Sequence, residues 1–501
     1  MESGYWLVAT IALPLLAAAV IIFVPEERRD VVRWISAAVG AALFAISMYV
    51  FFAYETGSGE GYQFFLRWDW LTEVGFLEEH GISLAFGIDG IAAAMVLLTG
   101  IVAFGGVLIS WKIEHRNKDF FALFWVLVSG VYGTFTALDL FFFFFWYEVA
   151  VLPMYLLIAV WGASSVFPAF TRTKEYSAMK LTVMLVAASI LIFIGIFAVF
   201  NEAGEGTFDL QTLYLHTFDE NFQKAVFPLF VIGCGVLAGL WPFHTWSPDG
   251  HVAAPTAVSM LHAGVLMKLG AFGIIRLGIQ LLPAGAEFWM PGLMVLATTN
   301  VVYGAFAATA QKDFKYMIGY SSVSHMGYVL MGLATMNVIG VNGAVLQMFS
   351  HGVMTAMFFA MVGAIYDQAH TRDMSLFSGL VNKMPLFVFF FGVAGLASLG
   401  LPGLSGFVAE FNVFVGTFKT YPWAGALGIF AAAMTAVYIL RMMSLSFFGP
   451  FNERWNELKD MTRLELATAV LLLAFILFMG LWPAPFVDRI SESVISLPGV
   501  S

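Results

Sequence analysis

Long apolar runs separated by short polar connections dominate this sequence. Fourteen of these runs approach the roughly 20 residues that a helix needs to cross the hydrocarbon core of a membrane. The pattern therefore predicts an all-α integral membrane protein with about 14 transmembrane helices. The first run follows a short N-terminus without a basic segment, so we expect a retained helix rather than a signal peptide. The expected spans are 4–24, 32–53, 88–111, 119–137, 138–161, 177–200, 225–246, 253–281, 289–310, 314–335, 340–366, 384–419, 423–447 and 463–484.

The connections between these runs alternate in charge. Connections after even-numbered spans are acidic: residues 54–87 hold six acids against Arg67, and residues 201–224 hold five acids against Lys224. Cytoplasmic loops of membrane proteins are enriched in Lys and Arg. We therefore expect the odd-numbered connections in the cytoplasm and both termini on the other side. The basic residues of those odd-numbered connections are Arg28, Arg29, Arg33, Lys112, Arg116, Lys118, Arg172, Lys174, Lys312, Lys315, Arg372, Lys383, Arg441, Arg454, Lys459 and Arg463.

Two of the expected spans are interrupted. Helix 7 contains Pro242, and helix 12 contains the run GLPGLSG at 400–406. If helices 4–8 and 9–13 are two five-helix units, both breaks fall in the fourth helix, and the odd helix number gives the units opposite orientations. Broken helices at matching places in inverted repeats indicate a transport site near the membrane midplane. The expected domains are an N-terminal segment (1–118), a first repeat (119–281), a second repeat (289–447) and a C-terminal helix with its tail (448–501).

Composition supports the membrane assignment. The chain is 60% hydrophobic and 11% charged, whereas about 25% charged residues is usual for a soluble domain. The only cysteine is Cys234. A single thiol excludes disulfides within the chain, Cys-ligated iron–sulfur clusters and Cys-type zinc sites.

Ionisable residues interrupt the apolar pattern at several places. Three histidines (His244, His251 and His262) and Asp249 surround the break at Pro242, and Lys268 follows inside the next apolar run. Proline removes a helix hydrogen bond, and the freed backbone groups then need partners that hydrocarbon cannot supply. Ionisable residues inside a membrane segment indicate movement of ions or protons.

Glu148 and Lys268 lie near the centres of helices 5 and 8. A charged side chain at that depth costs about 2.5–3.5 kcal/mol on insertion scales, so we expect both side chains to face the protein interior. A structural ion pair, or a protonated and hydrogen-bonded carboxyl group, is the alternative interpretation of Glu148; a structural role is likewise open for Lys268.

Helices 10 and 11 each carry a polar seam with one histidine. Helical spacing places Ser321, Ser322 and His325 on one face of helix 10. Because the reference pKa of histidine is close to neutral, it can relay protons near pH 7. A satisfied core histidine and a haem ligand are the competing interpretations of these histidines. The seam of helix 11 consists of Gln347, Ser350, His351 and Thr355.

Glu410 follows the break in helix 12. We regard it as a further candidate in the proton path. An acidic residue that caps the N-terminus of a half-helix is the alternative interpretation.

Several of these motifs together resemble one known family. They are similar to the antiporter-like membrane subunits of respiratory complex I (NADH:quinone oxidoreductase), which have relatives in Mrp-type cation/proton antiporters and membrane-bound hydrogenases. The likeness extends from residue 86 to the end of helix 13. The motifs are FGIDG at 86–90, PFHTWSPDGH at 242–251, APT at 254–256, YSSVSHMG at 320–327, HTRD at 370–373 and LPGLSGFVAE at 401–410.

The resemblance implies roles for individual residues. Glu148 is similar to the family's helix 5 glutamate, Lys268 to the helix 8 lysine that bridges two half-channels, and Glu410 to the helix 12 carboxylate at the exit. His325 and His351 match histidines of the central hydrophilic axis. His244 belongs to the matched motif at the break and is a further candidate in the proton path.

One position departs from the family. A lysine usually lies five residues before the proline of the PFHTW motif and pairs with the helix 5 glutamate, but Leu237 occupies that place here. We hypothesise that His262 replaces this lysine. The alternatives are that Lys180 does so, or that the first half-channel is silent.

The resemblance implies a proton-translocating subunit driven by quinone reduction elsewhere in a complex I-type enzyme. We expect it in the plasma (inner) membrane of a bacterium, with other antiporter-like subunits and the lipid bilayer as partners and no nucleic acid. We expect no cofactor on this chain, with FMN, iron–sulfur clusters and quinone in partner subunits. A cation/proton antiporter or bicarbonate-uptake subunit is the alternative, and a structural scaffold is a third possibility.

Overall fold

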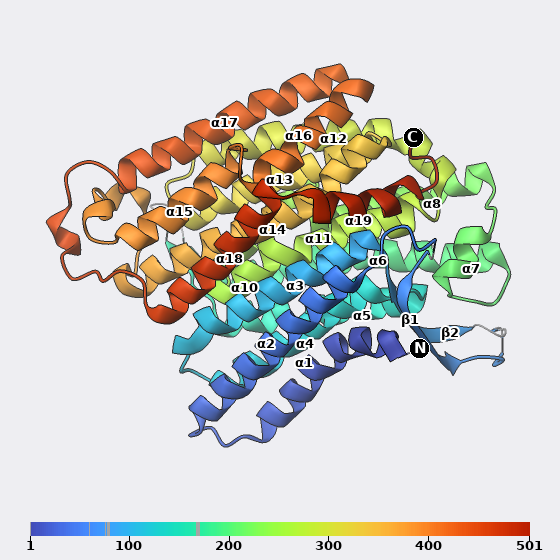
Figure 1. Ribbon diagram of the computed structural model, residues 1–501, viewed down its shortest axis with the longest axis horizontal. Coiled ribbons are helices and arrows are strands. Elements are labelled where there is room, and N and C mark those ends of the chain that lie inside the picture. The colour runs from blue at the N-terminus through green and yellow to red at the C-terminus, as the bar shows by residue number, and fades with distance from the viewer. Residues whose placement is uncertain (1, 60, 76, 78–80, 167–170) are drawn as a thin grey trace.

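The chain folds into one long helical bundle (Figure 1). The computed structural model describes residues 2–59, 61–75, 77, 81–166 and 171–501. Of the acidic residues counted in the 54–87 connection, Glu60, Glu78 and Glu79 lie outside the described residues. The N-terminal helices are α1 (Tyr5–Phe23), α2 (Arg29–Ala53) and α3 (Gly90–Ile109).

The expected first repeat contains one broken helix. The polypeptide leaves α8 at Gly239, which adopts a left-handed conformation (φ 81°), and re-enters a helix only after the turn that contains Pro242. The eighth span is also irregular, because π-helical turns at His262–Leu266 and Ile274–Ile279 flank α11. The helices of this unit are α4 (Asn117–Thr136), α5 (Leu140–Trp161), α6 (Lys174–Ala203), α8 (Glu220–Ala238), α9 (Trp246–Ala253), α10 (Thr256–Leu261) and α11 (Met267–Gly273).

The expected second repeat has the same feature. Residues 399–404 separate α15 from α16, so the fourth helix of this unit is broken as well. The breaks in spans 7 and 12 that the sequence predicted are thus present. The helices of this unit are α12 (Pro283–Thr309), α13 (Phe314–Ala334), α14 (Val338–Ala369), α15 (Pro385–Ser398), α16 (Ser405–Thr420) and α17 (Pro422–Ser446).

Three elements form the buried centre of the bundle. The eighth span and α14 are buried along the whole length of their apolar windows, and α3 packs against both. Helices that are apolar on all sides belong in such a position. Polar side chains on α14 therefore face other helices of the same chain rather than lipid.

In the part of the chain that the structure describes, twelve helices are long and apolar enough to cross a membrane. The two other expected spans correspond to α13, whose polar seam makes it less apolar, and to the broken pair α15 and α16. The chain is thus a helical multi-pass membrane protein, while the total of 14 crossings and the inverted relation of the repeats stay predictions.

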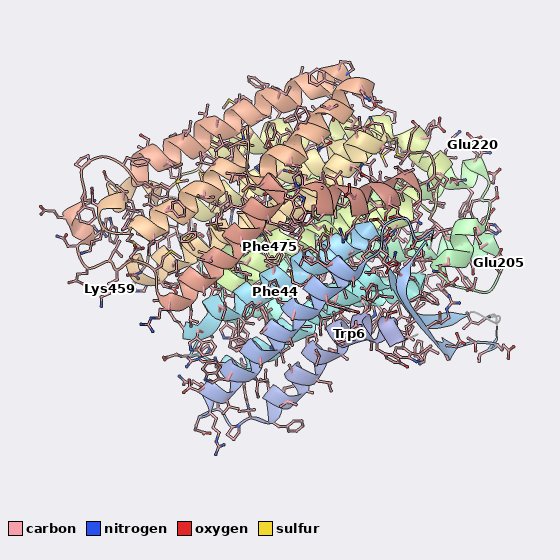
Figure 2. All side chains as sticks on the ribbon, in the orientation of Figure 1. Trp6, Phe44, Glu205, Glu220, Lys459 and Phe475 are labelled. Atoms are coloured by element: carbon pink, nitrogen blue, oxygen red, sulfur yellow. The ribbon has the colours of Figure 1, made fainter. Side chains whose placement is uncertain are left out.

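Both termini lie at the same end of the bundle (Figure 1). This end carries the antiparallel hairpin of β1 and β2, the short helix α7, and the acidic residues Glu205 and Glu220, whereas Lys459 lies at the opposite end (Figure 2). The sequence analysis missed the strands and the C-terminal α19, which packs on α3 and α14. The remaining elements are β1 (Gln63–Leu71), β2 (Ile82–Ile88), β3 (Ser165–Val166), β4 (Thr171–Arg172), α7 (Leu210–Leu215), α18 (Arg463–Leu481) and α19 (Ala484–Ile495).

Candidate proton path

Lys268 lies in α11 at the centre of the buried helices. Its side chain is fully buried, and about 18 Å of helix separates it from Thr256 at the start of the span. Its Nζ donates a hydrogen bond to the carbonyl of Ala263, which belongs to the first π-helical turn, at 2.5 Å. The same Nζ lies 2.6 Å from Nδ1 of His351 on α14. Turns of this kind recur at functional sites, and here one supplies an acceptor for the ammonium group.

A second histidine continues this contact. His325 on α13 lies beside His351, with ring centroids 5.5 Å apart. Its Nε2 is 2.9 Å from Ser398 Oγ, and its Nδ1 is 3.1 Å from Gln347 Nε2. Both rings are fully buried, so neither is an ordinary surface histidine.

The line ends at Glu410 on α16. Its Oε1 lies 3.2 Å from His325 Nδ1, and these two groups form an ion pair when the imidazole is protonated. Glu410 lies in the second turn of α16 and is not an N-terminal cap of this half-helix. The capping interpretation therefore does not apply. Lys268, His351, His325 and Glu410, which we call the central line, thus form one polar line across four helices.

The break between α15 and α16 makes room for this carboxylate. Gly400 lies in the break with a φ of 68°, a conformation that L side chains rarely adopt. A Cβ atom at this position would lie 2.9 Å from Glu410 Oε2. The glycine therefore permits both the backbone turn and the close approach of the carboxylate.

The C-terminal end of the eighth span carries a buried ion pair. Arg276 Nη2 lies 2.7 Å from Asp89 Oδ1, and both side chains are buried. Each charge is compensated by its partner, and removal of either group would leave an uncompensated buried charge.

Two further histidines pack together on the other side of Lys268. His251 on α9 and His262 lie with their ring centroids 4.1 Å apart, and Trp246 stacks on His262 at 5.2 Å. Ser247 Oγ lies 3.0 Å from His251 Nε2. His262 begins the π-helical turn whose Ala263 carbonyl accepts the hydrogen bond of Lys268. His262 thus belongs to the surroundings of Lys268.

Lys180 is bound elsewhere. Its Nζ donates hydrogen bonds to Asp249 Oδ2 at 2.9 Å and to the carbonyl of Thr245 at 3.0 Å. Asp249 also pairs with Arg172 and accepts a hydrogen bond from the Tyr316 hydroxyl. In the described part of the chain, neither Lys180 nor His262 makes a recorded contact with Glu148. The buried carboxylate of Asp249 thus binds Lys180, which is therefore not placed to replace the missing lysine.

Glu148 lies at the edge of the bundle, away from the central line, although its Oε1 is buried without a hydrogen-bond partner among the described residues. Its half-buried side chain lines an open depression between α5 and α6 with Phe144, Val186, Ser189 and Ile190. Leu237, which replaces the usual lysine, is buried in α8. The hydrophobic periodicity alone could not predict which way Glu148 points, because α5 is apolar on every face.

His244 follows the break in span 7. Its ring lies 5.0 Å from that of Tyr303 on α12, in an edge-on arrangement. Neither ring nitrogen has a hydrogen-bond partner among the described residues. The structure therefore leaves His244 beside α12 rather than within the central line.

Sequence reasoning missed several polar partners. Ser398, at the end of α15, binds His325, and Ser405, at the start of α16, binds Ser350 at 2.8 Å. Their position next to a helix break was the available signal. Within the described ranges, no group of three or more His, Cys, Asp or Glu side chains is arranged to hold a metal ion.

Comparison with known proteins agrees with this geometry. The family model described as "NADH:quinone oxidoreductase/Mrp antiporter, TM" matches residues 137–435. NAD(P)H-quinone oxidoreductase chain 4 1 of Synechococcus elongatus is 36% identical, over 96% of this chain and 89% of that protein. Chain 4-3 of the same enzyme from Nostoc sp. is 37% identical, over 90% and 79% of the two chains.

Two solved structures are similar along nearly their whole length. A chain of respiratory complex I from Thermus thermophilus has a TM-score of 0.86 and 26% identity and covers 98% of both chains. A chain of the Mrp complex from Dietzia sp. also has a TM-score of 0.86, with 18% identity, and covers 99% of this chain and 98% of that one, which shows a common fold. The matched motifs, the central line and these relatives together establish that the chain belongs to the NADH:quinone oxidoreductase/Mrp antiporter family of membrane subunits.

Proposed function

We propose that this chain translocates protons as a membrane subunit of a complex I-type NADH:quinone oxidoreductase, through Lys268, His351, His325 and Glu410. The observation that carries the proposal is the central line itself. Four buried ionisable side chains from four helices follow one another. Lys268 Nζ lies 2.6 Å from His351 Nδ1, the ring centroids of His351 and His325 are 5.5 Å apart, and His325 Nδ1 lies 3.2 Å from Glu410 Oε1. Lys268 Nζ to His351 Nδ1 is already a hydrogen-bonded pair, so a proton passes between them without any movement of the backbone.

His325 has two binding arrangements available. As a neutral ring it donates from Nε2 to Ser398 Oγ and accepts the Gln347 amide at Nδ1. After protonation both nitrogens donate, and Nδ1 then faces Glu410. When His325 gains a proton, its Nδ1 therefore exchanges the neutral Gln347 amide for the Glu410 carboxylate. This exchange directs the proton toward Glu410.

The required energies are accessible. Opposite charges that approach one another favour the ionised forms, and a change of one pKa unit corresponds to about 1.4 kcal/mol. Moving one charge across 100 mV costs about 2.3 kcal/mol. A few such changes along the line are therefore sufficient for uphill transfer.

The remaining functional assignments follow from the family. Quinone reduction, FMN and iron–sulfur clusters would belong to partner subunits, and this chain would carry no redox centre. The Lys- and Arg-rich end of the bundle would face the cytoplasm, which leaves both termini outside. The bicarbonate-uptake alternative of the sequence analysis has no specific observation in its favour.

A cation/proton antiporter is the second candidate function, because the family includes Mrp antiporters and the fold is common to both. The two differ in the subunits that accompany the chain. Affinity purification of the tagged chain from its own membranes, followed by identification of the copurified proteins, distinguishes them. NADH- and quinone-handling subunits support the oxidoreductase, and a small set of purely membrane subunits would overturn it.

Replacement of Lys268 tests the proton path. In inside-out vesicles that contain the assembled complex, we expect Lys268→Ala to lower NADH-driven proton uptake by about 100-fold, as loss of a positioned acid–base group does. The measurement is the quench of an acridine dye, with NADH oxidation followed in parallel. Lys224→Ala, in an exposed pair with Glu220, is the matched control. Full proton uptake by an assembled Lys268→Ala complex would contradict the proposal.

A further inference from the structure

A cavity lies at the end of the bundle where α3 and α14 finish. Its volume is about 450 Å³, and volumes of about 300–1,000 Å³ are typical of ligand pockets. The expected first unit lines it with residues 254–257, and the second unit with Lys315 and Arg372. The short helical turn that follows α3 adds Ser110 and Lys112. Three parts of the chain that are distant in sequence therefore meet in this cavity.

Two of the three cations that line the cavity are paired with carboxylates. Arg372 Nε lies 3.1 Å from Asp313 Oδ2. Lys112 Nζ lies 2.7 Å from Glu465 Oε1 and 4.0 Å from Asp367, a carboxylate of the lining itself. The charges of Arg372 and Lys112 are therefore balanced by the protein.

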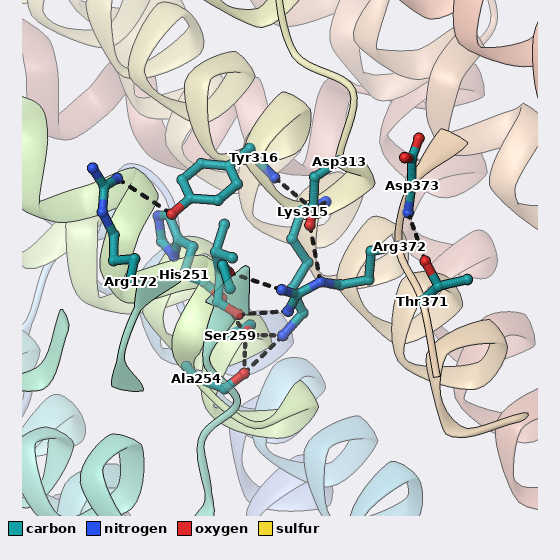
Figure 3. Close-up of polar contacts among 12 residues, drawn as sticks. Arg172, His251, Ala254, Ser259, Asp313, Lys315, Tyr316, Thr371, Arg372 and Asp373 are labelled. Carbon is teal, nitrogen blue, oxygen red and sulfur yellow. Dashed lines mark hydrogen bonds and ion pairs between the residues drawn. The ribbon is translucent and has the colours of Figure 1, made fainter. Parts of the chain in front are cut away.

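Lys315 is the third cation, and its surroundings are different. It is only 4% exposed, and the recorded partners of its Nζ are two neutral oxygens, the Ala254 carbonyl at 2.7 Å and Ser259 Oγ at 3.2 Å (Figure 3). An ammonium group has three N–H donors, so one donor is left. A buried charge without a partner of opposite sign is costly. An anion in the cavity would supply the charge and the acceptor that Lys315 lacks.

Ser110 presents a second unused polar group to the same cavity. Its side chain is 3% exposed, and its Oγ has no hydrogen-bond partner among the described residues. Buried polar groups are normally hydrogen-bonded. The hydroxyl of Ser110 and the remaining donor of Lys315 therefore point to a ligand that carries several acceptor oxygens.

The remaining lining indicates where such a ligand comes from. Ile109, Ile113 and Trp161 give the cavity an apolar part. Trp161 ends α5, and tryptophan is enriched where membrane helices reach the polar surface of the bilayer. Lysine binds phosphate groups as a point charge, and basic pockets between membrane helices bind phospholipid headgroups.

We propose that this cavity binds a phosphate group, with Lys315 and Ser110 as its ligands. An anionic phospholipid and a phosphate from solution offer the same chemistry: a negative charge for the ammonium group and acceptor oxygens for the hydroxyl. The bound group connects the end of α3 with the start of α13, so it stabilises the junction between the N-terminal helices and the second unit. The site is separate from the central line and does not depend on proton transfer.

Thermal unfolding of this chain within its complex tests the site, because a ligand that binds only the folded protein raises the unfolding temperature. Cys234 is buried and is the only cysteine of the chain. A maleimide dye therefore labels this chain only when it opens, and gel electrophoresis separates it from its partners. The complex is washed free of lipid in an uncharged detergent. The probes are a short-chain phosphatidylglycerol, the diacylglycerol with the same chains, and inorganic phosphate.

We expect phosphatidylglycerol to raise the labelling midpoint of the wild type by about 3 °C, and the diacylglycerol to leave it unchanged. Lys315→Met should weaken binding by about tenfold or more, whereas Lys315→Arg keeps the charge and should keep the shift. Ser110→Ala, a smaller change that the fold tolerates more easily, should weaken binding by about fivefold. Lys383→Met removes an exposed lysine outside the cavity and is the matched control, with the wild-type shift.

The three probes distinguish the sources of the phosphate. A shift with phosphatidylglycerol alone identifies a lipid, and a shift with inorganic phosphate identifies a phosphate from solution; either result supports the inference. Absence of a shift with both probes, an equal shift with the diacylglycerol, or a wild-type response of Lys315→Met and Ser110→Ala would overturn it. Proton uptake is not measured here, so failure of this test leaves the proposed function intact.

Discussion

The two units expected as repeats, residues 119–281 and 289–447, differ in how their ionisable residues are placed. In the second, His351, His325 and Glu410 are buried and follow Lys268 in one line of contacts. In the first, Glu148 lies in an open depression at the periphery, and Lys180 is held by Asp249. The second set thus forms a continuous line of neighbouring buried groups from the break to Lys268, in which only the step between the two histidine rings has no direct hydrogen bond.

The difference also bears on the departure at position 237. Without a lysine there, a buried Glu148 would lack a partner of opposite charge, and an unpaired buried charge is costly. Its side chain is half-buried between α5 and α6, and its Oε1 is buried without a hydrogen-bond partner among the described residues. The loss of the lysine therefore leaves this carboxylate without a charged partner in the described part of the chain.

The first prediction disturbs the stronger repeat at its break. Gly400→Ala would place a methyl group 2.9 Å from Glu410 Oε2 and would cost about 1 kcal/mol in backbone strain. We expect proton uptake per NADH oxidised to fall by roughly fivefold, because a free-energy change of about 1 kcal/mol alters an equilibrium constant by about that factor. The measurement is the same dye quench in vesicles.

Gly292→Ala is the control for this substitution. Gly292 lies in α12, and a Cβ atom there meets nothing within 4 Å. Proton uptake should be unchanged in this variant. Equal effects of the two substitutions would show that the approach of Gly400 to Glu410 has no special role.

The second prediction attempts to restore the weaker repeat. Leu237→Lys reintroduces the lysine that the family usually has. We expect Glu148→Gln to change proton uptake by less than about twofold in the wild type and by more in the Leu237→Lys background, so that a double-mutant cycle gives a nonzero coupling. Leu237→Met, which conserves volume, serves as the control. Zero coupling would mean that position 237 does not communicate with Glu148.

Much of the fold could be predicted from the sequence. Apolar runs of membrane length located the helices, while the sidedness inferred from the alternating charge of their connections stays a prediction. Pro242 and the glycines of 400–406 marked both helix breaks. The hairpin of β1 and β2 was missed because its connection was treated only as an acidic loop.

The site was predictable only in part. Helical spacing correctly placed Gln347 and His351 on one face of α14, because polar positions three or four residues apart on a helix share one face; that this face meets His325 on α13 became clear only from the structure. Spacing could not place Glu148, since α5 is apolar all around. It also missed Lys315, which was counted as a loop charge, because its burial depends on how residues 254–259 fold over it.

The central claim is that the second repeat conducts protons and the first repeat does not limit them. The most direct test compares the number of protons taken up per electron in two single variants, Glu410→Gln and Glu148→Gln, assembled in the same vesicle system. The account predicts that Glu410→Gln lowers this ratio, while Glu148→Gln leaves it at the wild-type value. A lowered ratio in Glu148→Gln with an unchanged ratio in Glu410→Gln would contradict it.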